Sequence, residues 1–264
     1  MSQLLAGKTA LVLGVANKWS LAYAIAQAFA REGARLIFTY QSERQKLTVE
    51  ELGTNLKAHQ VLPCDVSQDT ALDRLTKELK DSGTVLNTVV HSIAFANRED
   101  LDGSFLDTSR AGFALAQDIS AYSLVAVARA TVPAMAAAEQ GGASLITLSY
   151  LGAVRVVQNY NVMGVAKASL EACVRYLSND LGPSNIRVNA ISAGPVKTAS
   201  ARGVRDFSKM LGSFAQLAPL RRNTDPAEVG DAAVFLASDL GRGVTGNVIY
   251  VDSGFQVMGL AYPG

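Results

Sequence analysis

The sequence predicts an α/β protein in which one parallel β-sheet is covered by helices on both faces. Three observations lead to this prediction. Apolar, strand-like runs alternate with helix-like runs from one end of the chain to the other. The apolar runs are nearly continuous, which is typical of strands that are buried on both faces. The 264 residues include no linker, internal repeat or low-complexity segment, so we expect one domain over residues 1–264.

Seven apolar runs are expected to form the parallel sheet. In chain order they cover residues 9–15, 35–40, 59–66, 86–94, 143–150, 186–194 and 247–254. Helices are expected between them, among others over residues 20–32, 68–82, 161–181 and 226–238. The last of these follows Asp225-Pro226, a pair that typically begins a helix. Repeated strand–helix units around a buried seven-stranded sheet indicate a doubly wound, Rossmann-type fold.

Two segments depart from the simple alternation. Residues 195–219 have mixed polarity and follow the carboxyl end of a strand, where ligands bind in open α/β sheets. We expect a partly helical lid over a substrate there, with a plain surface loop as the alternative. Residues 121–138 are long and apolar, but Arg129 and Pro133 interrupt them. We expect a helix that packs against the domain and, in one interpretation, a partner subunit, rather than a membrane span.

Charge and composition exclude several classes of partner. With 24 basic and 23 acidic side chains the net charge is +1, which predicts no strong attraction to nucleic acid or anionic lipid. Cys64, Cys173, His59 and His91 show no metal-ligand or redox spacing, so no metal site is expected. The first residues do not resemble a secretory signal. We therefore expect a cytoplasmic protein, with an organelle stroma as the alternative.

A phosphate-binding loop is expected after the first strand. Gly14 ends that strand, and Ser20 precedes an apolar-periodic helix whose N-terminus could face a pyrophosphate. The usual G-x-G-x-x-G fingerprint is absent, because the next glycine after Gly14 is Gly33. A plain strand-to-helix turn explains the same residues equally well. Residues 92–94 end the fourth strand and are small or apolar, as a backbone that passes close to a cofactor requires, although packing explains them almost as well.

The ends of the second and third strands bear on the adenosine part of a cofactor. Gln41 at the tip of the second strand is neutral and can bond ribose hydroxyls, which favours NADH. Arg44 keeps NADPH open, because arginine suits a 2′-phosphate. Asp65 and Val66 at the end of the third strand are expected to hold the adenine, but Asp65 could equally cap the next helix.

Two tyrosines and a lysine follow the fifth strand. Tyr150 lies at its carboxyl end, and Tyr160 and Lys167 are seven residues apart, which places them on one face if both are helical. An ammonium there can bind a nicotinamide ribose, and a phenol can stabilise an oxyanion. The alternative is two half-buried tyrosines and a solvated lysine.

Eight stretches together resemble the NAD(P)H-dependent enoyl-acyl-carrier-protein reductases of type II fatty acid synthesis, which are divergent short-chain dehydrogenases. They are "GVANKWSLAYAIA", "TYQ", "CDV", "HSIAFA", "LSYLGA", "YNVMGVAKASLEA", "RVNAISAGPVKT" and "VTGNVIYVDSGF". The resemblance extends from Leu5 to about Gly259. Its specific signals are the tyrosine–lysine spacing and "SAGP" followed by a threonine. Ala94 departs from the pattern, since many relatives carry glycine there, which puts the transfer of inhibitor sensitivity in doubt.

The resemblance implies reduction of the 2,3 double bond of a trans-2-enoyl thioester on acyl carrier protein. It implies that Tyr160 donates to the enolate oxygen, that Lys167 holds the nicotinamide ribose, and that Tyr150 lines the pocket. Thr198 would bond the pyrophosphate and Val196 would face the carboxamide. The implied cofactor-binding residues are Gly14, Ser20, Leu21, Gln41, Asp65, Val66, Ser92, Ile93, Ala94, Lys167, Val196 and Thr198.

The resemblance also implies a homotetramer and a basic docking surface for the acidic carrier protein near the lid. Candidates for that surface are Lys197, Arg202, Arg205 and Lys209, although a solvated face of the lid explains these residues nearly as well. Two alternatives remain open. A 3-ketoacyl or other carbonyl reductase would use Ser149 but would need a lysine four residues after the tyrosine, where this chain has Gly164. A non-catalytic dinucleotide-binding regulator would not need Tyr160.

Overall fold

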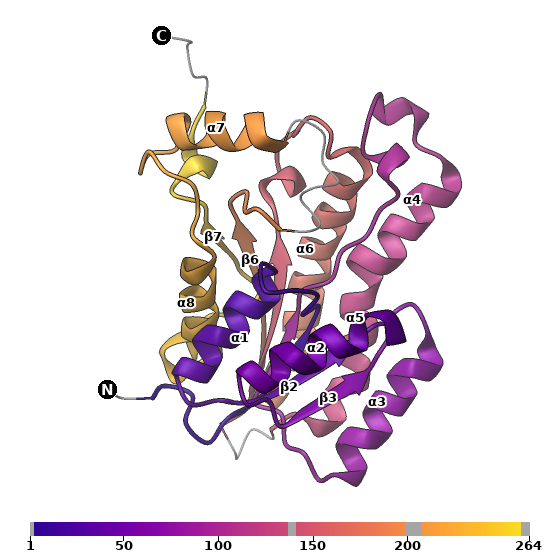
Figure 1. Ribbon diagram of the computed structural model, residues 1–264, viewed down its shortest axis with the longest axis vertical. Coiled ribbons are helices and arrows are strands. Elements are labelled where there is room, and N and C mark those ends of the chain that lie inside the picture. The colour runs from indigo at the N-terminus through magenta and orange to yellow at the C-terminus, as the bar shows by residue number, and fades with distance from the viewer. Residues whose placement is uncertain (1–2, 137–140, 199–206, 260–264) are drawn as a thin grey trace.

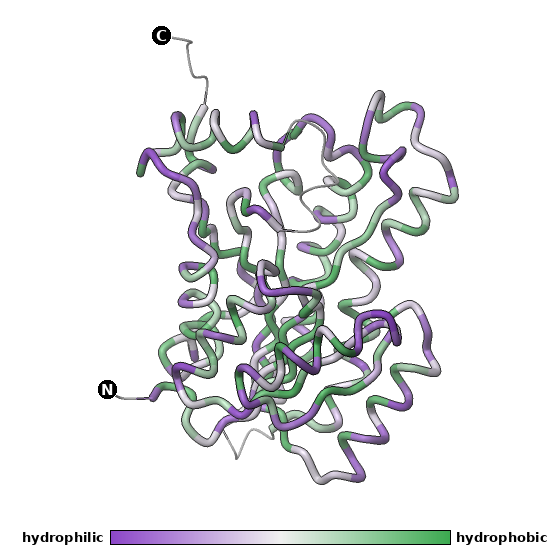
Figure 2. The backbone as a smooth tube through the Cα atoms, in the orientation of Figure 1, coloured by the Kyte–Doolittle hydropathy of each residue, from purple (hydrophilic) through white to green (hydrophobic). Residues whose placement is uncertain are grey.

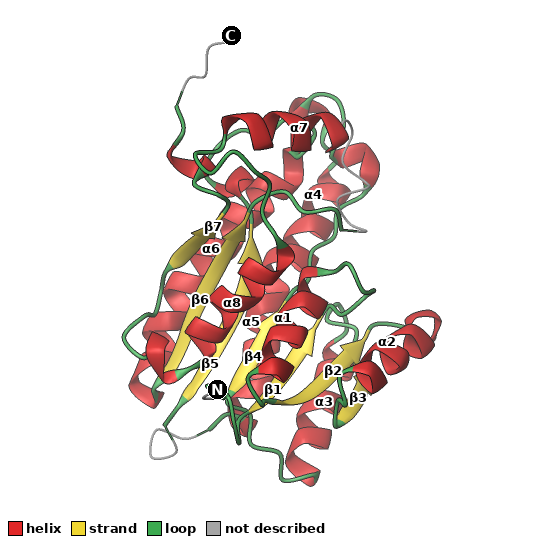
Figure 3. Cartoon of the chain, turned by 60° about the vertical axis from the view of Figure 1, so that its left-hand side comes forward, coloured by secondary structure: helices red, strands yellow, loops and turns green. Residues whose placement is uncertain are grey.

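The strands form the predicted sheet. The computed structural model describes residues 3–136, 141–198 and 207–259. Figure 1 shows the fold of the chain, and Figure 3 labels the seven strands across the sheet. The strands are hydrogen-bonded in the order β3-β2-β1-β4-β5-β6-β7, and every neighbouring pair is parallel. They are β1 (Thr9–Leu13), β2 (Arg35–Tyr40), β3 (Gln60–Pro63), β4 (Thr88–His91), β5 (Ala143–Ser149), β6 (Ile186–Ala193) and β7 (Val248–Val251). Each strand lies within its predicted run, so the seven-stranded parallel sheet is confirmed.

Helices cover both faces of this sheet. They are α1 (Leu21–Arg31), α2 (Glu43–Asn55), α3 (Asp69–Asp81), α4 (Arg110–Gln117), α5 (Ser123–Thr131), α6 (Asn161–Leu181), α7 (Phe207–Leu217) and α8 (Pro226–Ala237). One hydrophobic cluster joins α1, α2 and α8 to one face, and a second joins α3, α5 and α6 to the other (Figure 3). On β1, Val12 belongs to the first cluster and Leu11 to the second, because successive side chains point to opposite faces. Hydrophobic residues accordingly run along the strands in the middle of the molecule (Figure 2).

The apolar run over residues 121–138 is helical as far as the described residues extend. A π-helical turn at Asp118–Tyr122 joins α4 to α5, and a short 3-10 turn at Val132–Ala134 follows α5. By length and composition alone the stretch Arg110–Ala134 could cross a membrane, with a mean hydropathy of 1.3, but half of that window is buried inside the protein. A core helix of a soluble protein has the same properties, and α5 packs as one against α3.

The sheet order places a crevice between β1 and β4. From β1 the chain first adds β2 and β3 on one side and then crosses to β4 on the other. In open α/β sheets, ligands bind at the carboxyl ends of the strands beside such a switch point. Gly14 directly follows β1 with φ +93°, and a Cβ there would lie 2.0 Å from the carbonyl oxygen of Ser92. Only glycine therefore allows the ends of β1 and β4 to approach this closely.

The Gly14→Ala variant is expected to lower the free energy of unfolding by about 2–5 kcal/mol, because it combines an unfavourable backbone conformation with a steric clash. Urea denaturation followed by circular dichroism measures this change. Gly7→Ala is the matched control, since Gly7 has φ +74° but nothing within 4 Å of an added Cβ, and it should cost only about 1–2 kcal/mol. Equal effects of the two substitutions would contradict the role of the Ser92 contact.

Candidate active site

A cavity of about 370 Å³ lies at the carboxyl ends of β5 and β6, beneath α7. We call it the tyrosine cavity. Its walls are mostly apolar and come from α1, the loop after β4, the start of α6, the loop after β6 and α7. Six residues of the predicted site line it, namely Leu21, Ala94, Tyr150, Tyr160, Val196 and Thr198. The structure thus brings predicted site residues from four distant segments of the chain into one cavity.

The two tyrosines contact each other at the edge of this cavity. Tyr150 directly follows β5, and its ring lies edge-on to that of Tyr160, with the centroids 5.0 Å apart and an interplanar angle of 67°. Burial raises the pKa of Tyr150 to about 12 and raises the pKa of Tyr160 further above its ordinary value, with a smaller contribution from Tyr150. Both phenols therefore keep their protons near neutral pH and can act as hydrogen-bond donors.

Tyr160 is held by an unusual backbone at the start of α6. It is the residue before the helix rather than part of it. The prediction that Tyr160 and Lys167 share one helix face required both to be helical, and only Lys167 is. Asn159 and Asn161, the neighbours of Tyr160, have φ values of +62° and +25°, a region that asparagine tolerates better than most residues. Asn161 also donates from Nδ2 to the carbonyl oxygen of Gly103 at 3.2 Å. The pattern Asn-Tyr-Asn was the signal for this turn, and the sequence interpretation missed it.

Two glycines make room for the ring of Tyr160. A Cβ on Gly152 would lie 2.4 Å from Tyr160 Cδ1, and a Cβ on Gly164 would lie 2.9 Å from the carbonyl oxygen of Gly152. Position 164 is the place where a lysine four residues after the tyrosine would stand. Because even a methyl group is crowded there, the local packing disfavours a lysine at position 164.

Lys167 is buried beside the end of β5. Its side chain is on α6, only 5% exposed, and Nζ donates to the carbonyl oxygen of Leu148 at 2.7 Å. The predicted alternative of a solvated lysine is therefore wrong. Burial lowers the pKa of Lys167 to about 8, while the carboxylate of Glu171 acts in the opposite direction. Sequence reasoning did not single out Glu171.

His91 lies in the core near this lysine and is fully satisfied. Its Nδ1 is hydrogen-bonded to Thr147 Oγ1 at 2.9 Å and its Nε2 to Ser123 Oγ at 2.8 Å. Burial lowers the pKa of His91 to about 3, with a smaller effect from Lys167, so the ring is neutral. Within the described part of the chain, no group of three or more His, Cys, Asp or Glu side chains could hold a metal ion.

The N-terminus of α1 borders a second cavity of about 650 Å³, which also receives Val196. Ser20 is the cap of α1, and its Oγ accepts from the backbone N–H of Tyr23 at 3.3 Å. Lys18, Arg31 and Lys197 add positive charge to the walls, and Asp225 adds one negative charge. A helix N-terminus with nearby cations suits an anionic diphosphate, so these residues fit the predicted dinucleotide cofactor.

The adenosine end of the predicted site lies at the tips of β2 and β3. Gln41 directly follows β2 and is exposed, and its backbone N–H donates to Gln45 Oε1 at 3.1 Å. Asp65 accepts from the backbone N–H of Ser67 at 3.1 Å and from its Oγ at 2.8 Å, which closes a turn before α3. Val66 is buried in the core. The proposed contacts of these residues with ribose and adenine stay predictions.

Residues 92–94 run across the crevice beside β1. The N–H of Ser92 donates to the carbonyl oxygen of Leu13 at 3.2 Å, and Ile93 packs against the second hydrophobic cluster. Ala94 is exposed and lines the tyrosine cavity. This backbone therefore lies at the crevice between β1 and β4, and its approach to a cofactor stays a prediction.

The predicted lid, residues 195–219, is partly helical. Within it α7 covers the tyrosine cavity, and the Tyr150 hydroxyl donates to Met210 Sδ at 3.5 Å. Phe214 stacks on Phe255 with centroids 4.4 Å apart. Residues 199–206, and with them the predicted docking residues Arg202 and Arg205, lie outside the described residues. Met210 is a contact that sequence reasoning missed.

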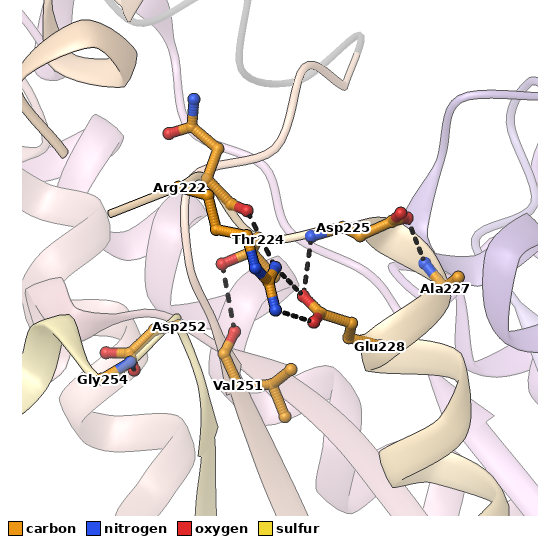
Figure 4. A network of polar contacts seen from close by, with 9 residues as sticks. Arg222, Thr224, Asp225, Ala227, Glu228, Val251, Asp252 and Gly254 are labelled. Atoms are coloured by element: carbon orange, nitrogen blue, oxygen red, sulfur yellow. Dashed lines mark hydrogen bonds and ion pairs between the residues drawn. The ribbon is translucent and has the colours of Figure 1, made fainter. Parts of the chain in front are cut away.

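A network of polar contacts anchors the segment that follows the lid helix (Figure 4). Arg222 forms an ion pair with Glu228, which also accepts from the backbone N–H of Asp225 at 2.9 Å. Asp225 caps α8, and Thr224 Oγ1 donates to the carbonyl oxygen of Val251 at 3.4 Å. The carboxyl end of the lid is thus tied to α8 and to β7.

Comparisons with known proteins identify the family of this chain. A family described as Enoyl-(Acyl carrier protein) reductase matches residues 14–256. The chain is 56% identical over 259 residues to the NADH-dependent enoyl-[acyl-carrier-protein] reductase FabI of Bacillus cereus, covering 97% of this chain and 100% of that relative. It is 50% identical over 258 residues to the NADPH-dependent FabI of Staphylococcus aureus, covering 96% of this chain and 98% of that relative.

A solved structure extends the likeness to three dimensions. The crystal structure of the Bacillus cereus enoyl-acyl carrier protein reductase with NADP+ and indole naphthyridinone superimposes with a TM-score of 0.93 at 55% identity. The alignment covers 97% of this chain and 99% of that one. Family match, identity and fold all extend over nearly the whole sequence, and this chain therefore belongs to the enoyl-acyl-carrier-protein reductase family.

Proposed function

We propose that the chain reduces the 2,3 double bond of a trans-2-enoyl thioester carried on acyl carrier protein, with NADH as the hydride donor. The observation that carries this proposal is the pair of neutral phenols of Tyr150 and Tyr160, whose rings contact each other and line a mostly apolar cavity. Such a cavity suits an acyl chain, and a phenol that retains its proton suits an oxygen that becomes negative.

The residues have separate tasks in this proposal. NADH, when bound, supplies the hydride for C3 of the enoyl chain. Tyr160 donates a hydrogen bond from its hydroxyl to the thioester oxygen as that oxygen becomes an enolate. A proton from the solvent then reaches C2, which completes the saturated thioester. Tyr150 lines the same cavity and orders the acyl end. Lys167 uses one N–H to bond Leu148 O, so two further N–H groups are available to ribose hydroxyls.

NADH is proposed as the preferred cofactor because Gln41, and not a basic residue, directly follows β2. The family contains both preferences, since the relatives from Bacillus cereus and Staphylococcus aureus are named for NADH and NADPH respectively. Arg44 lies in the first turn of α2. A 2′-phosphate would be recognised if this side chain turned toward the ribose.

A ketoreductase is less well supported by the same site. Ser149, the residue expected to assist that reaction, donates its Oγ proton to Glu171 at 2.5 Å and is buried. Gly164 leaves no room for a lysine at the usual spacing. The site thus lacks the arrangement that a carbonyl reductase of the superfamily would need.

The test follows the near-ultraviolet absorbance of NADH and of NADPH in parallel with the purified protein and a crotonyl thioester of coenzyme A. A decrease that requires both thioester and cofactor supports enoyl reduction, and the faster reaction identifies the cofactor. Consumption with acetoacetyl-coenzyme A alone would indicate a ketoreductase. Absence of turnover with every thioester, including those on acyl carrier protein, would leave the binding protein as the better hypothesis.

The Gly152→Ala variant is expected to lower kcat/KM for the crotonyl thioester by about ten- to a hundredfold, because the added methyl group displaces the Tyr160 ring from its position. Steady-state kinetics with NADH measures the loss. Gly243→Ala is the control, since nothing lies within 4 Å of a Cβ at that position, and its kcat/KM should equal the parent value. An unchanged kcat/KM in Gly152→Ala would mean that the position of Tyr160 is not critical.

We further propose that acyl carrier protein docks beside the lid and that four copies of the chain assemble. Lys197 and Lys209 are exposed there and suit an acidic partner. Phe113 and Tyr122 leave aromatic surface exposed on α4 and the following turn, as an interface requires. The single sheet supports one catalytic domain over residues 1–264. The proposed partners, NADH and acyl carrier protein, are water-soluble, which favours a cytoplasmic location. Light scattering gives the number of subunits, and a monomer would contradict the tetramer.

A further inference from the structure

A carboxylate is buried one helical turn after the active-site lysine. Glu171 is only 5% exposed and follows Lys167 by four residues on α6, so the two side chains lie on the same face of the helix. An ionised carboxylate is costly to bury unless hydrogen bonds or charges compensate it. Ser149 provides one such bond, from Oγ to Glu171 Oε1 at 2.5 Å.

Lys167 and Glu171 together hold the end of β5. Nζ of Lys167 donates to the carbonyl oxygen of Leu148, and Glu171 accepts from Ser149, the next residue. The residue after that is Tyr150, whose ring contacts Tyr160. Two adjacent turns of α6 are therefore bonded to the two residues that precede an active-site tyrosine.

Among the titratable groups around Lys167, Glu171 is the one that provides a negative charge on the same face of α6. His91 on β4 is neutral at ordinary pH, and the Tyr160 phenol keeps its proton. Burial raises the pKa of Tyr250 on β7, and the charges of Glu171, Arg155 and Asp252 have smaller effects on that pKa. Burial raises the pKa of Glu171, while the Ser149 bond, Arg175 and Lys167 lower it. Arg175, one turn further along α6, is exposed.

We infer that Glu171 is a positioning residue of the active site. Its negative charge keeps Lys167 in the ammonium form, and its bond to Ser149 fixes the strand end that carries Tyr150. The inference rests on the proposed role of Lys167 as the ribose ligand. Glu171 itself touches neither substrate nor cofactor and acts through its two neighbours.

The first test is an NMR titration of the full chain containing isotope-labelled lysine, in which the Lys167→Met variant assigns the Lys167 signal. A unit charge about 6 Å away, in surroundings of effective dielectric constant about 20–40, is expected to move the titration midpoint by about one to two pH units. In Glu171→Gln the midpoint of Lys167 should therefore fall by that amount. This readout requires no turnover, so an inactive protein and an uncoupled pair give different results.

The controls separate charge from structure. Glu171→Asp keeps the charge and should keep the Lys167 midpoint within about half a pH unit of the parent value. Arg175→Gln removes an exposed charge from the next turn and should also leave it nearly unchanged. Glu171→Leu is a second neutral variant, which should lower the midpoint as Glu171→Gln does. A midpoint in both neutral variants equal to that of the parent would overturn the inference.

The pH profile of kcat/KM provides the functional readout. In Glu171→Gln its alkaline limb should move toward lower pH, so that the loss relative to the parent is small near pH 6 and grows to about tenfold or more near pH 8. A purely structural role predicts the same loss at every pH. An equal loss across the range would therefore assign Glu171 to packing and overturn its proposed action on Lys167.

Discussion

Replacing Tyr160 by phenylalanine is expected to lower kcat for enoyl-thioester reduction by roughly 10²–10³-fold, because the change removes a donor aimed at a developing oxyanion. The donor is effective because burial keeps the phenol protonated and because a low local dielectric strengthens its hydrogen bond. The phenylalanine ring retains the edge contact with Tyr150 and the fit against Gly152. The loss would be smaller if a ribose hydroxyl of the cofactor donates to the same oxygen.

Two matched variants make this measurement specific. Tyr150→Phe should cost less, since the hydroxyl of Tyr150 bonds Met210 of the lid in this structure. Tyr176→Phe removes a hydroxyl from a tyrosine on α6 that is 76% exposed, and it should leave kcat for the thioester unchanged. Steady-state kinetics with saturating NADH compares all three. A kcat of Tyr160→Phe equal to that of the parent would remove Tyr160 from the mechanism.

The sheet was predictable because its strands carry a strong local signal. Residues such as Val89 and Leu145 are buried in continuous apolar runs, and a buried parallel strand needs such a run. Helix α2 gives no comparable signal. Its buried residues are Val49, Leu52 and Gly53 in an otherwise polar sequence, so the hydrophobic pattern that indicates a helix is weak there.

The site was only partly predictable, because some of its contacts join distant residues. Tyr150 and Tyr160 carried a recognisable spacing, and the structure brings their rings together. Met210 meets Tyr150 from sixty residues away, and the significance of Glu171 depends on Ser149 in another element. Nothing in the local pattern of a methionine or a glutamate on a helix indicates such a contact. These roles follow from packing and burial, which only the folded chain defines.

Replacing Lys167 by alanine is expected to weaken NADH binding by about 10- to 150-fold, the equivalent of one charge-assisted hydrogen bond of about 1.5–3 kcal/mol. Lys167→Met fills the space of the lysine side chain better than Lys167→Ala, because alanine leaves a cavity at that position. It should show a similar loss in calorimetric titration with NADH. Lys77→Ala, which removes a lysine whose side chain is 75% exposed on α3, is the control and should bind NADH as the parent does.

The pH dependence of this difference identifies the charge as its cause. Burial lowers the pKa of Lys167 to about 8, so the ammonium is present below that pH and is lost as the pH rises through it. NADH affinity of the parent should therefore be highest near pH 7 and fall above about pH 8. The affinity of Lys167→Met should stay nearly constant over the same range, and the two should converge near pH 10. A difference that persists undiminished at that pH would mean that Lys167 acts through packing rather than through its charge.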